Sequence, residues 1–206
     1  MKNLKLVIFD LDGVLVDACE WHRIALNEAL KDVCDYEISH EDHERIFNGI
    51  PTRVKLEKLT EMGKIPKSCH EEIYQIKQKK TVQIIKSRSK IRSEKIEMIE
   101  SLKRNRGLTV CCFTNSIRKT ADLMLKTSGV FDLLDMIVTN QDVKNPKPNP
   151  EGYLKILSHF NISPTDAIIV EDSPKGIEAA ILSGCKVIGV SGADQVTLEI
   201  FEEFLE

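Results

Sequence analysis

Five short apolar runs separated by helical patterns constrain the fold of this chain most strongly. The runs are rich in valine and isoleucine, which is typical of strands covered on both faces. Helical patterns lie between the later runs, and glycines such as Gly129 and Gly184 mark their ends. This alternation predicts right-handed crossovers and a parallel α/β sheet. The predicted strands are 6–9, 108–113, 136–139, 167–170 and 186–190, and the predicted helices between them are 120–127, 150–160 and 176–182.

The stretch 18–90 is the exception, because it contains no convincing strand. Its pattern predicts several helices instead, inserted between the first strand and the rest of the sheet. We therefore expect an α/β core domain made of 1–17 and 91–206, and a helical cap domain made of 18–90. The helices expected in the cap are 19–33, 40–47, 53–62 and 69–85.

Length and composition are consistent with a small cytoplasmic enzyme but do not identify one. The 206 residues are 42% hydrophobic and 30% charged, with a net charge of -3, and this balance gives no strong field for nucleic acid or a membrane. The amino terminus resembles no signal peptide, and no apolar run is long enough to span a bilayer. The six cysteines are scattered without CxxC spacing, so we expect reduced thiols and no zinc site. A monomer or weak dimer is expected.

Two aspartates, Asp10 and Asp12, directly follow the first predicted strand, in the segment 10–17. Carboxylates this close raise each other's pKa unless a cation lies between them. The carboxyl ends of strands are also where open α/β sheets bind ligands. The pattern thus indicates a metal-assisted site. The alternative is that both aspartates only form a turn or cap the next helix.

Three further polar clusters each follow a predicted strand. Residues 114–116 are Thr-Asn-Ser at a strand-to-helix turn, where free backbone N–H groups can also bind an anion. Three prolines surround Lys147 and restrict the backbone there. Glu171 and Asp172 form a second acidic pair. Each cluster has a structural alternative, a helix cap or a proline-rich connection, but four of them at one sheet edge favour an active site.

The order and spacing of these four motifs resemble the haloacid dehalogenase superfamily of phosphotransferases. The resemblance extends over nearly the whole chain, and 18–90 corresponds to the family's helical cap. It implies a Rossmann-like parallel sheet core with an inserted α-helical cap domain. The motifs that carry it are 9–13, 114–116, 147–150 with Glu151 and Tyr153, and 171–173 with Gly176.

The family resemblance also implies catalytic roles. Asp10 would be the nucleophile that forms an aspartyl-phosphate. Asp12 would protonate the leaving oxygen and then deprotonate the acceptor. Thr114 and Lys147 would stabilise the phosphoryl oxygens.

The same resemblance implies Mg2+ as cofactor. Its ligands would be Asp10, the backbone carbonyl of Asp12, and Asp172, with Glu171 in or near the outer coordination shell. Oxygen ligands of this kind suit a hard cation.

Cap residues would bind the substrate, as implied by similarity to the β-phosphoglucomutase-like subgroup. His22, Arg53 after Gly49, and Lys77 match its cap positions, and Arg53 lies one residue further from its glycine than the subgroup's pattern has it. Simple surface exposure is the alternative for His22, Arg53 and Lys77. In the core, Asn115 and Ser116 are also expected to bind substrate.

The function expected is Mg-dependent hydrolysis of a small phosphate ester, a sugar phosphate in particular, through an aspartyl-phosphate. The alternative is a phosphomutase that passes the phosphoryl group between hydroxyls of a sugar phosphate. A third hypothesis is a binding or regulatory protein that keeps the fold of a phosphatase.

Overall fold

The computed structural model describes residues 4–205 and divides the chain into two compact units. One unit contains 1–17 and 90–206, and the other contains 18–89. The first unit holds the sheet, and within the second unit the structure has helices only. Among the described residues, none of the helices combines the length and hydropathy needed to cross a membrane.

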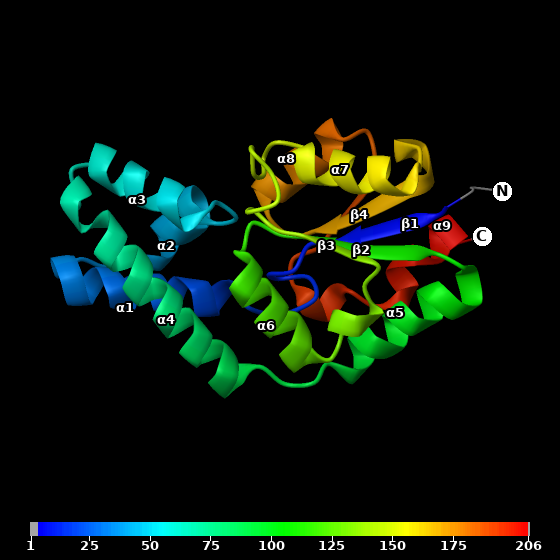
Figure 1. Cartoon of the computed structure of the whole chain (residues 1–206), viewed down its shortest axis with the longest axis horizontal. Helices are drawn as coiled ribbons and strands as arrows, with labels where there is room; N and C mark the ends of the chain where they lie inside the picture. The colour runs from blue at the N-terminus through cyan, green and yellow to red at the C-terminus, as the bar shows by residue number, and fades with distance from the viewer. Residues whose placement is uncertain (1–3, 206) are drawn as a thin grey trace. The chain divides into compact units, whose positions relative to one another are not determined.

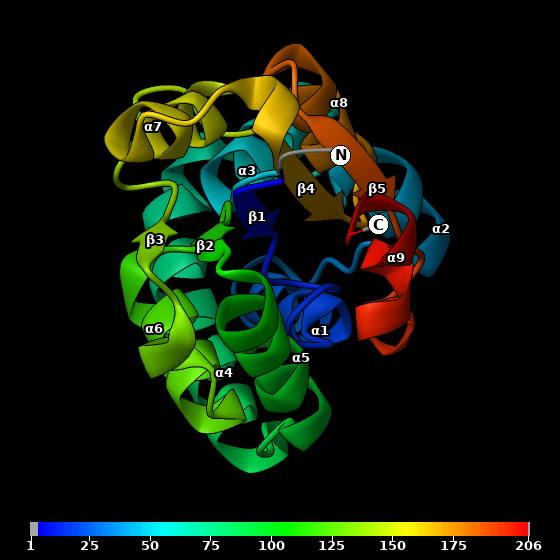
Figure 2. The same cartoon turned by 90° about the vertical axis from the view of Figure 1, so that its right-hand side faces the viewer.

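The first unit is built on a five-stranded parallel sheet with the order β3-β2-β1-β4-β5. Figure 1 and Figure 2 show α7 and α8 on one face of this sheet, and α5 and α6 on the other. The strands are β1 (Leu6–Phe9), β2 (Thr109–Phe113), β3 (Met136–Val138), β4 (Ala167–Glu171) and β5 (Lys186–Gly189). The helices are α5 (Ser93–Arg106), α6 (Arg118–Ser128), α7 (Glu151–Phe160), α8 (Pro174–Leu182) and the short α9 (Glu202–Leu205).

Alternate residues of the central strands form the apolar core of this unit. Leu6 and Ile8 of β1, for example, face the same cluster as Tyr153 and Ile156 of α7. A parallel sheet covered on both faces requires apolar side chains at both even and odd positions, and all four residues of β1 are buried. The expected α/β sheet, with its five strands, is therefore confirmed.

The helical unit has its own core. Its elements are α1 (Cys19–Cys34), α2 (His40–Asp42), the π-helical turn η1 (His43–Phe47), α3 (Thr52–Glu61), the 3-10 turn η2 (Lys67–Cys69) and α4 (His70–Arg88). Apolar side chains from α1, α3 and α4 meet in one cluster that includes Leu26, Leu30, Leu59 and Ile73. This cluster explains how so charged a segment remains folded.

Two differences from the sequence-based expectations have physical reasons. A single helix was expected over 40–47, but the structure has α2 followed by η1. The backbone hydrogen bonds change from α-helical to π-helical spacing at His43. The helix α5 was missed altogether. Most residues of α5 are polar or charged, and only a narrow face of the helix is buried. That face includes Met98, Ile99 and Leu102.

Candidate active site

The carboxyl ends of β1, β2 and β4 place polar side chains at one edge of the sheet. Asp10 follows β1, Thr114 follows β2, and Glu171 is the last residue of β4. Because these neighbouring strands are parallel and in register, their ends coincide. Lys147 enters from the loop between β3 and α7. Asp10, Thr114, Lys147 and Glu171 are all buried.

Lys147 joins the two acidic motifs. Its Nζ donates to Asp10 Oδ1 at 2.5 Å, to Glu171 Oε1 at 2.5 Å and to the Phe113 carbonyl at 2.8 Å. Its side chain is 2% exposed, so an unpaired ammonium here would be very costly. Three acceptors satisfy its three donors.

The charges in this site shift each other's protonation equilibria. Burial raises the pKa of Asp10 well above its usual range, and the Lys147 ammonium opposes that shift. Burial lowers the pKa of Lys147, but the carboxylates of Asp10 and Glu171 outweigh burial and raise it. The lysine therefore stays cationic, and its charge offsets part of the effect of burial on the pKa of Asp10.

Asp12 is held by hydroxyl groups from the turn after β2. Its Oδ2 accepts hydrogen bonds from Ser116 Oγ at 2.8 Å and from Thr114 Oγ1 at 3.3 Å. The left-handed conformation of Gly13, with φ of 86°, turns the chain directly after this aspartate. Asp12 is thus oriented at the same strand edge as Asp10.

Asn115 fixes the backbone of Lys147 from both sides. Its Nδ2 donates to the Lys147 carbonyl, and its Oδ1 accepts from the Lys147 N–H, each at 3.1 Å. Glu151 restrains the same loop by accepting from the N–H groups of Lys144 and Asn145. Through these contacts Asn115 positions the Lys147 backbone, and its contact with substrate stays a prediction.

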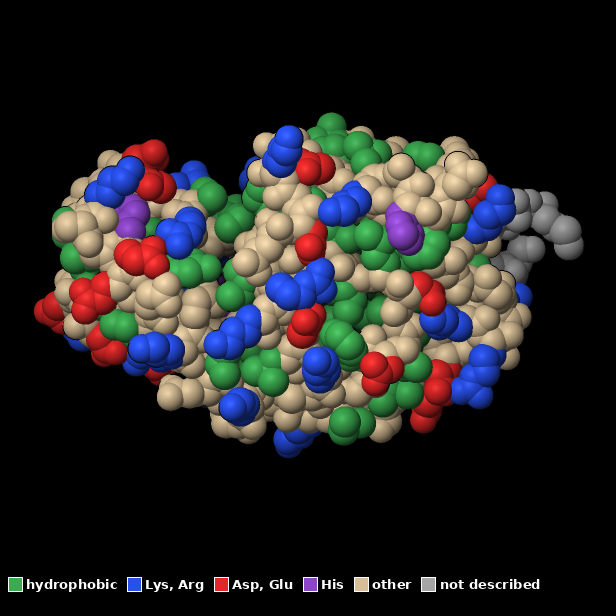
Figure 3. All heavy atoms as spheres, in the orientation of Figure 1, with side chains coloured by type: hydrophobic (Ala, Val, Ile, Leu, Met, Phe, Trp, Pro, Cys, Tyr) green, Lys and Arg blue, Asp and Glu red, His purple; other side chains and the backbone are tan. Residues whose placement is uncertain are grey.

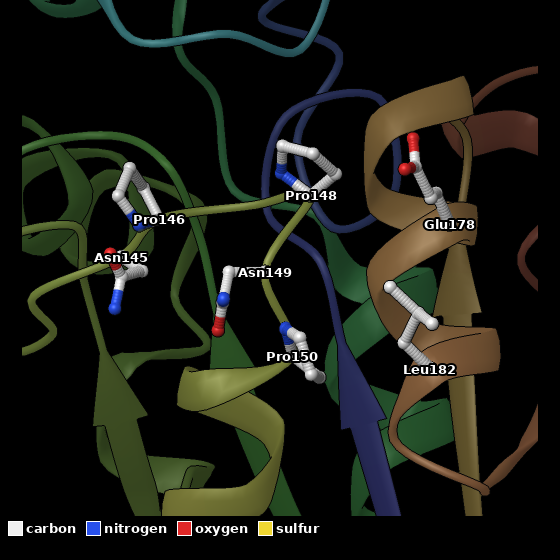
Figure 4. Close-up of a pocket in the computed structure, with 7 residues that line it drawn as sticks. All are labelled: Asn145, Pro146, Pro148, Asn149, Pro150, Glu178 and Leu182. Carbon is white, nitrogen blue, oxygen red and sulfur yellow. The ribbon is translucent and has the colours of Figure 1, made fainter.

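The proline-rich loop also lines a hollow of about 420 Å³, together with Glu178 and Leu182 of α8. Figure 4 shows Pro146, Pro148 and Pro150 along this hollow. Lys147 is not among its lining residues, since that side chain reaches Asp10 instead.

A group of carboxylates could hold a metal ion here. One ligand oxygen each from Asp10, Glu171 and Asp172 lie within 4.8 Å of one another. Asp10 and Asp172 are the better candidates for direct ligands, because both oxygens of Glu171 already accept several hydrogen bonds. Oε1 accepts from Lys147 and Tyr153, and Oε2 from the N–H of Asp172 and from Ser173. Carboxylate oxygens in this arrangement fit a hard divalent cation.

Two contributors to the site were not assigned a role from sequence. The Tyr153 hydroxyl donates to Glu171 at 2.9 Å from inside α7. Gly176 lies against the Glu171 carboxyl group, where any added Cβ would overlap it. Their positions beside the third and fourth motifs were the available signal, but contact across the fold could not be inferred from spacing.

In the helical unit, the structure brings His22 and Lys77 together. Lys77 Nζ lies 3.2 Å from His22 Nδ1, and Lys77 is only 6% exposed. This contact holds the two side chains together inside the helical unit.

Arg53 makes a separate set of contacts. Its guanidinium pairs with Glu71 at 3.1 Å and lies 4.2 Å from the centre of the Tyr74 ring. Gly49 has a φ of 73°, which favours glycine in the turn before α3.

On the face shown in Figure 3, lysine and arginine side chains alternate with aspartate and glutamate, and neither charge forms a dominant patch there.

Together, the parallel sheet and the acidic groups around a buried lysine at its carboxyl edge are typical of an α/β phosphotransferase. Comparison with known proteins agrees. The haloacid dehalogenase-like hydrolase model matches residues 7–190, and the chain belongs to that family.

Individual relatives support the same family. The chain is 29% identical to a phosphorylated carbohydrates phosphatase of Thermotoga maritima, covering 90% of this chain and 84% of the relative. It is 27% identical to the β-phosphoglucomutase of Bacillus subtilis, covering 98% and 93%. A crystal structure of β-phosphoglucomutase from Clostridium difficile superposes with a TM-score of 0.82 at 23% identity, covering 97% of this chain and 96% of that one. The expected enzyme class, a haloacid dehalogenase-family phosphatase, is thereby confirmed, with phosphomutases among its relatives.

Proposed function

We propose that this protein is a Mg-dependent phosphatase that hydrolyses a small phosphorylated metabolite, a sugar phosphate, through an aspartyl-phosphate. The observation that carries this proposal is the Lys147 ammonium bound to both Asp10 and Glu171 at the strand edge. It supplies a buried positive charge beside a carboxylate nucleophile. The phosphatase of Thermotoga maritima, named for phosphorylated carbohydrates, supports the substrate class.

The first step would be attack by Asp10 on phosphorus. The bond from phosphorus to the substrate oxygen breaks, and Asp12 donates a proton to that leaving oxygen. Lys147 and Thr114 would neutralise charge on the phosphoryl oxygens, which is most of what a protein contributes to this transfer. In the second step Asp12 takes a proton from water, and the water oxygen displaces Asp10 from phosphorus.

The metal site would be formed by Asp10, the Asp12 carbonyl and Asp172, with Glu171 behind them. A cation bound there would offset the repulsion between Asp10 and an incoming phosphate dianion. Glu171 would act mainly by holding Lys147 and the turn at Asp172, since Glu171 is fully buried and already accepts hydrogen bonds from both.

The test is release of inorganic phosphate from a panel of sugar phosphates in the presence of Mg2+. We expect Asp10→Asn to lower kcat by about a thousandfold or more, because the amide cannot act as the nucleophile. Asp132→Asn, at an exposed carboxylate in the same unit, is the matched control and should leave kcat unchanged. Full phosphate release by Asp10→Asn would contradict the proposed nucleophile.

The second candidate is a phosphomutase, favoured by the His22 and Lys77 pair and by the β-phosphoglucomutase of Bacillus subtilis among the relatives. A mutase would convert one positional isomer of a sugar phosphate into another and release little free phosphate. Measuring both products in one reaction distinguishes the candidates.

If Arg53 contacts substrate, Arg53→Ala should raise KM without weakening metal binding.

A further inference from the structure

Two cysteines of the helical unit meet where α1 ends and α4 begins. Cys34 is the last residue of α1, and Cys69 directly precedes α4. The two thiols interact electrostatically, and both side chains pack against the same apolar cluster. Both are only partly buried. Two thiols thus lie at one cluster, where a small oxidant can reach them.

Nothing in the proposed reaction uses these thiols. The neighbouring pair Cys111 and Cys112 differs in kind, because adjacent residues of β2 point to opposite faces of the sheet and both are buried. Cys34 instead ends α1 and Cys69 ends η2 directly before α4, and α1 and α4 pack extensively on each other. Their proximity thus results from tertiary structure and is not a consequence of sequence adjacency.

We propose that Cys34 and Cys69 are the site of a reversible disulfide that joins α1 to α4. The oxidant would be a small disulfide of the glutathione type. The Cys69 thiolate attacks one sulfur of the oxidant and releases one thiolate from it. The Cys34 thiolate then attacks the Cys69 sulfur of the mixed disulfide and releases the second thiolate. Two protein thiols lose two electrons and two protons, and the oxidant is reduced to two thiols.

The order of attack follows from the environments of the two sulfurs. Burial, together with the contact to Cys69, raises the pKa of the Cys34 thiol to about 11. The raised pKa disfavours the Cys34 thiolate as the first nucleophile, so Cys69 attacks the oxidant and Cys34 completes the bond.

The bond would close the segment 35–68 into a covalent loop. That segment includes α2, η1 and α3, and with them Gly49 and Arg53. Closing a loop of this length restricts the unfolded chain more than the folded one, so local opening of the helical unit becomes rarer. The inference does not depend on the proposed reaction, because it concerns only the covalent state of this unit.

The experiment is to treat the full-length protein with glutathione disulfide, alkylate the remaining thiols and map the peptides without reduction. We expect two of the six thiols to disappear and the tryptic peptides 32–45 and 68–77 to be linked. Dithiothreitol should separate them. Proteolytic cleavage within 35–68 should slow by about tenfold in the oxidised protein.

Variants separate this disulfide from other outcomes. Cys34→Ser and Cys69→Ser should each abolish the linked peptides, whereas the matched control Cys185→Ser should keep them. Stable glutathione adducts on Cys34 or Cys69, linkage to any other cysteine, or six unreacted thiols in wild-type protein would each overturn the proposal. The wild-type peptide map decides the question even where a serine variant fails to fold.

Discussion

Lys147 has the most demanding environment of the residues in the core site. A buried ammonium is tolerated only when its donors are satisfied by well-placed acceptors, and here Asp10, Glu171 and the Phe113 carbonyl provide them. The same contacts leave Glu171 with little freedom, because Tyr153 and the turn after β4 also bind it. The position of Lys147 thus depends on the position of Glu171. A variant that disturbs the packing around Glu171 tests this dependence.

Gly176→Ala should disturb Glu171, because the added Cβ would overlap its carboxyl group. We expect a loss of about 1–3 kcal/mol in the free energy of unfolding, as for overpacked sites, together with reduced activity as Lys147 shifts. Urea denaturation and steady-state kinetics measure the two effects. Gly192→Ala is the matched control, since a Cβ there meets no described atom within 4 Å. Equal effects of both variants would refute this explanation.

Among the elements of the helical unit, η1 contains an unusual buried histidine. His43 is 3% exposed, and both ring nitrogens are without a hydrogen-bond partner among the described residues. Burial, with Lys55 and Arg23 adding to it, lowers the pKa of His43 to about 3. The neutral ring is therefore the folded form, and the departure of η1 from α-helical geometry occurs where this ring is buried.

The folded pKa of His43 lies below its unfolded value of about 6.5, so the unfolded chain binds the extra proton first. Stability linked to this group is present above pH 6.5 and is lost as pH falls toward 3. The free energy of unfolding of the wild type should be lower at pH 5 than at pH 7. We expect His43→Leu to make this difference about 2 kcal/mol smaller. Urea denaturation at the two pH values measures it.

His159→Gln, at an exposed position of α7, is the control for that measurement and should leave the pH dependence unchanged. A His43→Leu variant with the pH dependence of the wild type would show that the buried ring does not control it.

At the scale of the whole molecule, the sheet order gathers four segments that lie far apart along the chain. The central strand β1 lies between β2 and β4, so Asp10 meets Thr114 on one side and Glu171 on the other. The loop before α7 adds Lys147. A cation that binds where these segments meet should stabilise the whole core unit, because its ligands come from segments that separate on unfolding.

Mg2+ at about a hundred times its dissociation constant should add about 2.7 kcal/mol to the free energy of unfolding. For a chain of this length that corresponds to a rise of roughly 5–10 °C in Tm. Thermal denaturation with Mg2+ and with a chelator measures the shift, and the chelator should also abolish activity. Asp172→Asn should lose most of the shift. An identical Tm with and without Mg2+ would argue against the metal site.

Much of the architecture follows from local pattern. Apolar runs such as 6–9 specify strands because only a sheet covered on both faces buries every side chain in them. The polar clusters at the strand ends also predicted which residues the fold would gather. The helix α5 escaped prediction, since its buried stripe is narrow and most of its residues are charged.

The sequence by itself determined the strands, the helical insertion and the motif residues, because hydrophobic periodicity and turn chemistry act over a few neighbouring residues. Only the tertiary structure decided that Asn115 holds the backbone of Lys147, that Tyr153 binds Glu171, and that Cys34 meets Cys69. Those contacts join residues that lie far apart in the sequence. They depend on how the helices pack on the sheet and on each other. No local pattern encodes such distances.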